Sequence, residues 1–172
     1  MKTRVGYTGG SSLDPTYRNM GDHTETVALD FDQEKITYED LLKLFWKWHN
    51  PCTQHCNQYM SAIFYHGTKQ KLLAEQSRDK LQKEMARPIA TKILPAETFY
   101  NAENYHQKYI LRQHHTVLDS LDLSDEDLIT STVAGKLNGY LGGYGTMEQF
   151  EIVSKSTVAC KLNSYLGGYG TV

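Results

Sequence analysis

The residues best suited to chemistry lie near the start of the chain, where glycines stand beside tyrosine and carboxylate side chains. Tyr7 to Gly10 forms a glycine turn after a short predicted strand, and Gly21 to Glu25 follows soon afterwards. Because glycine lets a backbone approach another molecule closely, this pattern suits a shallow site for a small polar ligand. The pattern also fits a plain turn with a solvated carboxylate, the commoner structure for such residues. Spacing leaves both interpretations open.

A second cluster combines histidine and cysteine. His49, Cys52, His55 and Cys56 offer two nitrogen and two sulfur ligands, enough in kind for zinc. Their spacing is more crowded than the usual separated pairs of zinc ligands, and no second pair follows. The pattern therefore favours an oxidisable loop with two free thiols. We predict no metal site and no bound cofactor.

Strands and helices must position these groups, and the first pair is visible in the apolar pattern. Val27, Leu29 and Phe31 alternate with polar or small residues, which predicts a half-buried strand ending at Asp32. Thr37 then caps a helix that stops at Asn50-Pro51. The apolar stripe of this helix comprises Tyr38, Leu41, Leu42, Phe45 and Trp48.

Further elements follow at regular intervals along the chain. They are a strand at 61–66, a helix at 68–85 with Leu72, Leu73, Leu81 and Met85 inward, a strand at 89–93, a helix at 102–112, and a capped helix after Ser124. Strands separated by helices predict a two-layer α+β or α/β domain.

Composition limits the function classes. The 172 residues suffice for one domain, and 18 Lys+Arg against 20 Asp+Glu leave a formal net charge of −2. This balance argues against a nucleic-acid or anionic-membrane binder, which would carry a basic surface. We find no apolar stretch that would span a bilayer and no secretory signal at the N-terminus. With three scattered cysteines, these features predict a cytoplasmic protein.

Glycine and proline divide the chain into a body and a tail. All four prolines lie in the first 95 residues, whereas eight of the 13 glycines lie at or after Gly135. We therefore predict a core domain at 1–115 and a helical, Gly/Tyr-rich extension at 116–172. The extension contains a duplicated 15-residue segment, Thr132–Thr146 and Thr157–Thr171, whose copies differ at two positions. Two copies are too few for a solenoid.

Several ordered motifs across residues 3–112 resemble one known family. VGYTGG, DPTYR, GDHTE, QYMSAIFYH and FYNAENYHQKY are similar to motifs of the peptide-methionine sulfoxide reductase A family, and KLNGYLGGYG resembles the C-terminal extension of an animal branch. The resemblance implies an α+β fold: a two-layer α/β sandwich with a mixed sheet and a ferredoxin-like core. It also implies that the first strand and helix of that core are missing.

The resemblance implies thiol-dependent reduction of methionine-S-sulfoxide, free or in oxidised proteins and peptides, and hence protein repair under oxidative stress. In the family a cysteine thiolate attacks the sulfur, a carboxylic acid protonates the oxygen, and two tyrosine hydroxyls hydrogen-bond that oxygen. The matching positions are Glu25 as the acid, with Tyr17 and Tyr59 as the two donors. An acid that acts near pH 7 needs burial to raise its pKa. Thioredoxin or another dithiol is the implied reductant, and the expected state is a monomer.

The family's Gly-Cys-Phe-Trp-Gly motif, which holds the nucleophile, does not occur in these residues, and QHCN stands where a family aspartate is expected. We therefore expect an N-terminally truncated chain. A thiolate is favoured near a helix N-terminus or a cation, whereas Cys52 and Cys56 follow a predicted helix C-terminus and Cys160 lies in the duplicated tail. We expect none of the three to replace the nucleophile. The alternatives are a non-catalytic methionine-sulfoxide-binding protein and an incomplete gene model.

Overall fold

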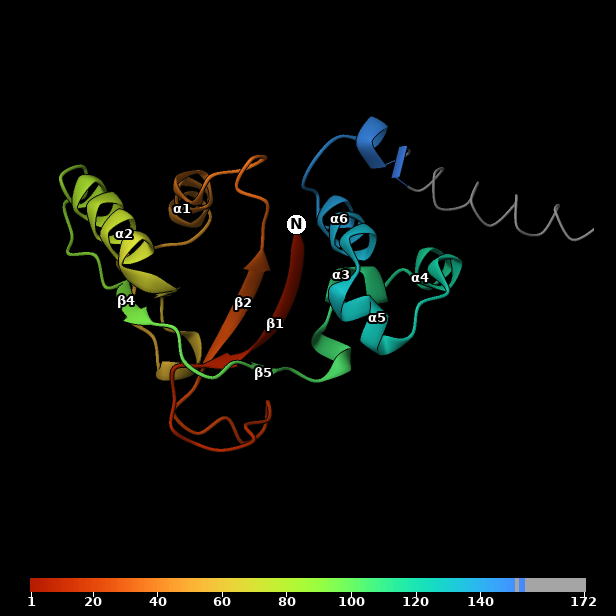
Figure 1. Cartoon of the computed structure of the whole chain (residues 1–172), viewed down its shortest axis with the longest axis horizontal. Helices are drawn as coiled ribbons and strands as arrows, with labels where there is room; N and C mark the ends of the chain where they lie inside the picture. Colours follow the sequence, from red (N-terminus) through yellow and green to blue (C-terminus); the bar gives the residue numbers. More distant parts are fainter. Residues whose placement is uncertain (151, 154–172) are drawn as a thin grey trace, which may run out of the picture. The chain divides into compact units, whose positions relative to one another are not determined.

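The computed structural model describes residues 1–150 and 152–153 and is a mixed α/β structure (Figure 1). The strands are β1 (Lys2–Thr8), β2 (Thr24–Asp30), β3 (Ala62–Tyr65), β4 (Lys92–Pro95) and β5 (Tyr100–Asn101). The α-helices are α1 (Tyr38–Lys47), α2 (Gly67–Gln82), α3 (Tyr109–Arg112), α4 (His115–Leu121), α5 (Asp125–Thr130) and α6 (Thr132–Leu141). Two short 3-10 helices are η1 (Asn57–Tyr59) and η2 (Asn104–His106).

The chain forms two compact units. One spans Val5–Glu103, and the other combines Met1–Arg4 with the chain from Asn104 onward. The boundary at residue 115 that the composition indicates stays a prediction.

Small sheets organise the Val5–Glu103 unit. Three strands lie in the order β2-β1-β5, and β1 pairs antiparallel with β5, placing Tyr7 opposite Tyr100. Strands β3 and β4 pair in parallel, with Ile63 opposite Ile93. A parallel pair needs a long crossover connection, and α2 provides it.

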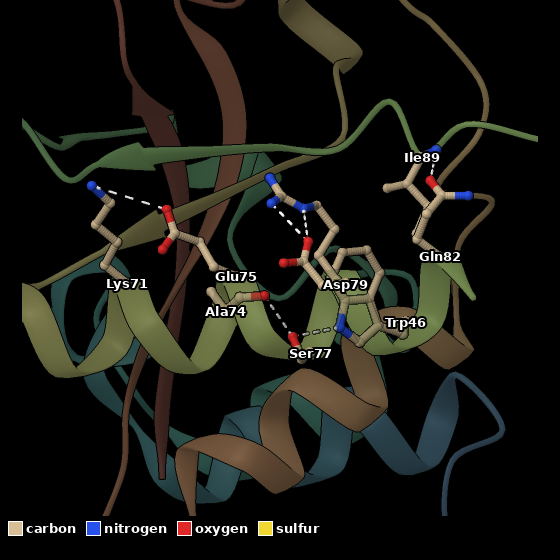
Figure 2. A network of polar contacts seen from close by, with 9 residues as sticks. Trp46, Lys71, Ala74, Glu75, Ser77, Asp79, Gln82 and Ile89 are labelled. Atoms are coloured by element: carbon tan, nitrogen blue, oxygen red, sulfur yellow. Dashed lines mark hydrogen bonds and ion pairs between the residues drawn. The ribbon is translucent and has the colours of Figure 1, made fainter. Parts of the chain in front are cut away.

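Helices α1 and α2 pack together beside the β3–β4 pair. Leu42, Ile63 and Ala74 form the buried cluster at this contact. Figure 2 shows a polar contact between the two helices, in which Trp46 Nε1 donates a 3.0 Å hydrogen bond to Ser77 Oγ. Ser77 Oγ in turn donates to the Ala74 carbonyl at 2.8 Å, so the partly buried indole N–H and the hydroxyl both have partners.

The strand predicted from Val27, Leu29 and Phe31 exists, but its buried face was predicted wrongly. Strand β2 ends at Asp30, and Val27 is 55% exposed while Thr24 is 2% exposed. Thr24 points inward because its hydroxyl donates to the Asn57 carbonyl at 2.9 Å. Since side chains alternate along a strand, this anchor turns the apolar set outward.

Two other expected core positions are also solvent-exposed. Trp48, predicted in the apolar stripe of the first helix, is 59% exposed and follows the last residue of α1. Leu72, predicted on the inner face of α2, is 51% exposed. The N-cap predictions are confirmed, because Thr37 Oγ1 accepts from Asp40 N at 3.1 Å and Ser124 Oγ accepts from Asp127 N at 3.1 Å.

The single helix predicted at 102–112 is wrong. That segment begins directly after β5 and contains η2 and the short α3, and Lys108 between the two helices has a φ of 53°. The buried Lys108 Nζ donates to the carbonyl oxygens of Thr3 and Ile129, the latter at 3.0 Å. Burial lowers the pKa of this lysine. These tertiary contacts hold Lys108 in a left-handed conformation that interrupts a continuous helix.

The unit that includes the chain from Asn104 onward is helical and has its own core. Its buried members are Leu111, Leu121, Leu128, Ala134 and Leu137. Helix α6 packs on α3, and the Asn138 side chain accepts a 3.1 Å hydrogen bond from Leu111 N. The first copy of the duplicated segment supplies α6, and the second copy lies outside the described residues. Within the described part of the chain, none of the helices has the length and apolarity to cross a membrane.

Candidate functional site

The three residues that the resemblance assigns come from separate segments of the Val5–Glu103 unit. Glu25 is the second residue of β2, Tyr59 is the last residue of η1, and Tyr17 lies in the connection between β1 and β2. The backbone around Tyr17 forms a tight turn, because Thr16 and Asn19 exchange backbone hydrogen bonds of 3.2 and 3.0 Å. This turn is one of the constraints on the backbone at Tyr17.

The structure brings these segments together. The hydroxyls of Tyr17 and Tyr59 are hydrogen-bonded to one another. Gln58 Nε2 donates a 2.8 Å hydrogen bond to Glu25 Oε1. Through these contacts the two phenols and the carboxylate occupy one polar surface.

The neighbouring groups also shift the pKa of Tyr59. The pKa of Tyr59 is raised, first by its hydrogen bond to Tyr17, then by desolvation, and further by the charges of Tyr17, Glu25 and Cys56. A phenol with a raised pKa keeps its proton and remains a hydrogen-bond donor. Tyr17 is 41% exposed, Tyr59 is 51% exposed and Glu25 is exposed, so the site is open to solvent.

The glycine turn serves the protein's own packing. A side chain at Gly10 would meet Asp22 Oδ1 at 2.5 Å and His23 N at 2.7 Å. A side chain at Gly21, whose φ is 62°, would come even closer to Ser12 Oγ. The backbone approach that suggested a ligand is therefore an approach between two segments of this chain, which favours the turn interpretation.

Asp22 and His23 hold that turn together. Asp22 accepts hydrogen bonds from the backbone amides and hydroxyls of Ser11 and Ser12, which hold the pKa of its carboxyl well below the ordinary value. The buried His23 ring accepts from Gly10 N through Nδ1 at 3.2 Å and contacts the Ser12 carbonyl through Nε2 at 2.7 Å. These partners require the tautomer protonated at Nε2.

Cys56 lies closer to this surface than the sequence indicated. It is exposed, its carbonyl accepts a 3.1 Å hydrogen bond from Tyr59 N, and negative charge on its sulfur contributes to the raised pKa of Tyr59. The sequence signal for this proximity was the short spacing, because Cys56 stands three residues before Tyr59. Cys52 is partly buried, with Sγ 3.5 Å from the Arg87 carbonyl, and Cys160 lies outside the described residues.

Within the predicted histidine–cysteine cluster, His49 has a structural role. His49 contacts the Phe45 carbonyl through Nδ1 at 2.5 Å and Ser61 Oγ through Nε2 at 2.7 Å, so both ring nitrogens have protein partners. Among residues 1–150 and 152–153 we find no group of three or more His, Cys, Asp or Glu side chains arranged to hold a metal ion.

Comparisons with known proteins identify the family. Residues 1–136 match the family model described as peptide methionine sulfoxide reductase. Residues 122–153 match the model described as selenoprotein methionine sulfoxide reductase A, helical domain.

Individual relatives agree with these models. A peptide methionine sulfoxide reductase of Drosophila melanogaster is 49% identical over 154 residues, covering 88% of this chain and 63% of the relative. Peptide methionine sulfoxide reductase A5 of Oryza sativa is 42% identical, covering 81% of this chain and 58% of the relative. The chain thus spans about three fifths of the length of these relatives.

Solved structures share the fold. Mxr1 from Saccharomyces cerevisiae in reduced form aligns with a TM-score of 0.61 and 26% identity, covering 65% of this chain and 71% of that chain. Methionine sulfoxide reductase A of Corynebacterium diphtheriae aligns with a TM-score of 0.57 and 30% identity, covering 65% and 63%. The ordered motifs, the gathered tyrosines and these matches agree: the chain belongs to the peptide methionine sulfoxide reductase family.

Proposed function

We propose that this chain binds methionine-S-sulfoxide on the surface formed by Tyr17, Tyr59 and Glu25 and takes part in its thiol-dependent reduction to methionine. The observation that carries the proposal is the hydrogen-bonded pair of phenols, Tyr17 and Tyr59, with the Glu25 carboxyl held beside it. The family to which the chain belongs supports the substrate class.

The proposed roles follow from the polarity of a sulfoxide. Its oxygen carries negative charge, and a sulfoxide oxygen placed between the two phenols would replace their mutual contact and accept from both hydroxyls. Neutralising that charge makes the sulfur a better electrophile. A thiolate then attacks the sulfur, the oxygen passes to the thiol as a sulfenic acid, and methionine leaves. A dithiol reduces the sulfenic acid, which releases water and forms a disulfide.

Glu25 has the role of proton donor to the sulfoxide oxygen in this scheme. A carboxylic acid donates only when it is protonated, and removal from water favours that neutral form. Because Glu25 is exposed, bound substrate must shield its carboxyl group from water. The apolar methyl and methylene groups of the methionine side chain are suited to exclude water there.

Other parts of the proposal rest on the family resemblance and on composition. They are thioredoxin or another dithiol as reductant, oxidised proteins and peptides as substrates in protein repair, and no bound cofactor. A cytoplasmic location, a monomeric state and a ferredoxin-like core belong to the same proposal.

A direct assay tests the activity. The 172-residue chain is incubated with dithiothreitol and a peptide carrying methionine-S-sulfoxide, with the R-epimer as the control. Reduction selective for the S-epimer would support the proposal, and the Cys52→Ser, Cys56→Ser and Cys160→Ser variants would then identify the thiol used. Equal reduction of both epimers by folded protein would contradict it.

A binding assay tests the surface separately. We expect weak affinity for the S-sulfoxide peptide that is lost on Glu25→Gln or Tyr17→Phe. Unchanged affinity in both variants would contradict the assignment of these residues. Binding that depends on them without any turnover would support the non-catalytic alternative.

A further inference from the structure

Glu103 binds two elements of the Val5–Glu103 unit with its two carboxylate oxygens. Its Oε2 accepts a 2.7 Å hydrogen bond from the hydroxyl of Tyr7. Its Oε1 accepts a 3.0 Å hydrogen bond from the backbone N–H of Tyr17. Tyr7 is 2% exposed and belongs to β1, so one end of this bridge is fixed in the core.

The other end of the bridge reaches the candidate site. The backbone that Glu103 holds belongs to Tyr17, whose phenol is hydrogen-bonded to Tyr59. A continuous series of contacts therefore runs from the buried Tyr7 through Glu103 to Tyr17 and on to Tyr59. We propose that Glu103 is a positioning residue, whose carboxylate fixes the Tyr17 backbone and thereby sets the Tyr17 phenol beside Tyr59. The inference rests on the proposed function, in which these two phenols bind the sulfoxide oxygen.

The chemistry of the bridge explains why a carboxylate suits this position. Tyr7 and the Tyr17 amide are both donors, and a carboxylate offers an acceptor oxygen to each. Hydrogen bonds to an ionised acceptor are stronger and shorter than neutral ones. Glutamine at position 103 would retain a weaker form of this bridge. Its carbonyl can accept from the Tyr17 amide while its NH₂ group donates to the Tyr7 oxygen. Alanine loses both contacts.

The decisive measurement reports on Tyr17 and Tyr59 without requiring activity. Tyrosine labelled with carbon-13 at Cζ gives the pKa of Tyr59 by NMR, and Tyr59→Phe identifies its signal. In Glu103→Ala we expect the Tyr59 pKa to fall toward its ordinary value of 10.0, because the hydrogen bond to Tyr17 is its largest upward influence. We also expect exchange of the Tyr17 amide hydrogen to accelerate by about 5- to 30-fold.

Matched variants separate positioning from a general loss of structure. Glu103→Gln should keep most of the Tyr59 shift and most of the amide protection. Glu97→Ala, which removes an exposed glutamate from the preceding loop, should change neither quantity. If Glu103→Ala unfolds the protein, Tyr7→Phe removes one contact only and should give a smaller change in the same direction.

The outcomes distinguish this inference from the proposed function. A Tyr59 pKa and a Tyr17 amide exchange rate that are unchanged in folded Glu103→Ala would overturn the positioning role. The Tyr59 pKa and the Tyr17 exchange rate could respond as expected while the affinity for S-sulfoxide is unaffected by Tyr17→Phe. In that case the positioning role of Glu103 is supported and the proposed ligand is wrong. If both respond and affinity falls in Glu103→Ala but recovers in Glu103→Gln, both are supported.

Discussion

Thr24 Oγ1 donates a 2.9 Å hydrogen bond to the carbonyl oxygen of Asn57, which joins the start of β2 to the helical turn that carries Tyr59. The adjacent contact between Gln58 and Glu25 joins the same two segments on the outer side. These contacts set the distance between the proposed acid and the Tyr59 donor.

Replacing Thr24 with valine should therefore weaken both the fold and the site. Valine keeps the shape of the buried threonine but leaves the Asn57 carbonyl without this donor, which should cost about 1–2 kcal/mol in unfolding free energy. Affinity for an S-sulfoxide peptide should fall as well, because Tyr59 is held less firmly. Denaturant unfolding and peptide titration measure the two effects. Thr24→Ser keeps the hydroxyl and serves as the control, and wild-type affinity in Thr24→Val would contradict the prediction.

Removing the Tyr38 hydroxyl should increase the free energy of unfolding, whereas Thr24→Val should decrease it. Tyr38 packs against the cluster of Leu42, Ile63 and Ala74, and within the described residues its buried oxygen has no hydrogen-bond partner. Desolvation raises the pKa of this phenol. Removing an unsatisfied buried hydroxyl should stabilise the fold by about 1 kcal/mol. Thermal unfolding of Tyr38→Phe should show a higher Tm. The control variant Tyr109→Phe, at an exposed position, should show no change in Tm. A lower Tm in Tyr38→Phe would mean that the hydroxyl binds water.

Features encoded by neighbouring residues were predictable from the sequence. Thr37 and Ser124 each cap a helix with a backbone amide only three residues away, and both predictions are confirmed. The strand at 61–66 was also correct, as Ala62–Tyr65 is buried or half-buried throughout. Such local signals need no knowledge of the tertiary fold.

Features that depend on distant partners were not predictable in the same way. The buried face of β2 follows from the contact between Thr24 and Asn57, and the break in the 102–112 segment follows from the carbonyls around Lys108. The connection of Glu103 to Tyr7 crosses most of its unit and has no local pattern. The assignment of Tyr17, Tyr59 and Glu25 came from family resemblance, and spacing does not reveal that their segments meet.

Asp22 gives a prediction about pH. Its hydrogen bonds from Ser11 and Ser12 lower the pKa of its carboxyl in the folded state relative to the ordinary value of 3.8. The ionised carboxylate therefore stabilises the fold above 3.8, and this contribution is lost as the pH falls through the lower, folded-state pKa. The difference in unfolding free energy between wild type and Asp22→Asn should be constant near neutral pH and shrink in acid.

The pH dependence must be compared between wild type and Asp22→Asn, because other carboxylates also lose a stabilising contribution as the pH falls. Asp40, for example, has its pKa lowered to about 2 by Lys43 and Thr37. Asp40 is unchanged in Asp22→Asn, so its contribution cancels in the difference. A difference that grows in acid would mean that folding raises the pKa of Asp22 instead of lowering it.

Lys108 should be a strong determinant of stability in the unit that includes the chain from Asn104 onward. Its ammonium group donates to the carbonyls of Thr3 and Ile129 from a buried position. Lys108→Met keeps much of the side-chain volume but leaves both acceptors without this donor, which should cost about 2–3 kcal/mol. Thermal unfolding should show a clear loss in Tm for Lys108→Met. Lys136→Met, at an exposed position on α6, should change the Tm little, and equal Tm values for the two variants would contradict the role of Lys108.

Chemical modification of the Cys56 thiol should block the candidate site. It is exposed and its carbonyl accepts a 3.1 Å hydrogen bond from Tyr59 N, whereas Cys52 is partly buried with its sulfur at the Arg87 carbonyl. In a Cys160→Ser background, a bulky maleimide should therefore react faster with Cys56 than with Cys52.

The modified protein tests whether that thiol borders the ligand. The group attached to Cys56 would occupy space beside Tyr59 and exclude a peptide from the phenols, so affinity for the S-sulfoxide peptide should fall by at least about 10-fold, equivalent to about 1.4 kcal/mol. Cys56→Ser should bind the peptide normally and resist the reagent, while Cys52→Ser should remain sensitive to it. Full affinity after stoichiometric labelling of Cys56 would place the ligand away from Tyr59, because two bulky groups cannot fill the same volume.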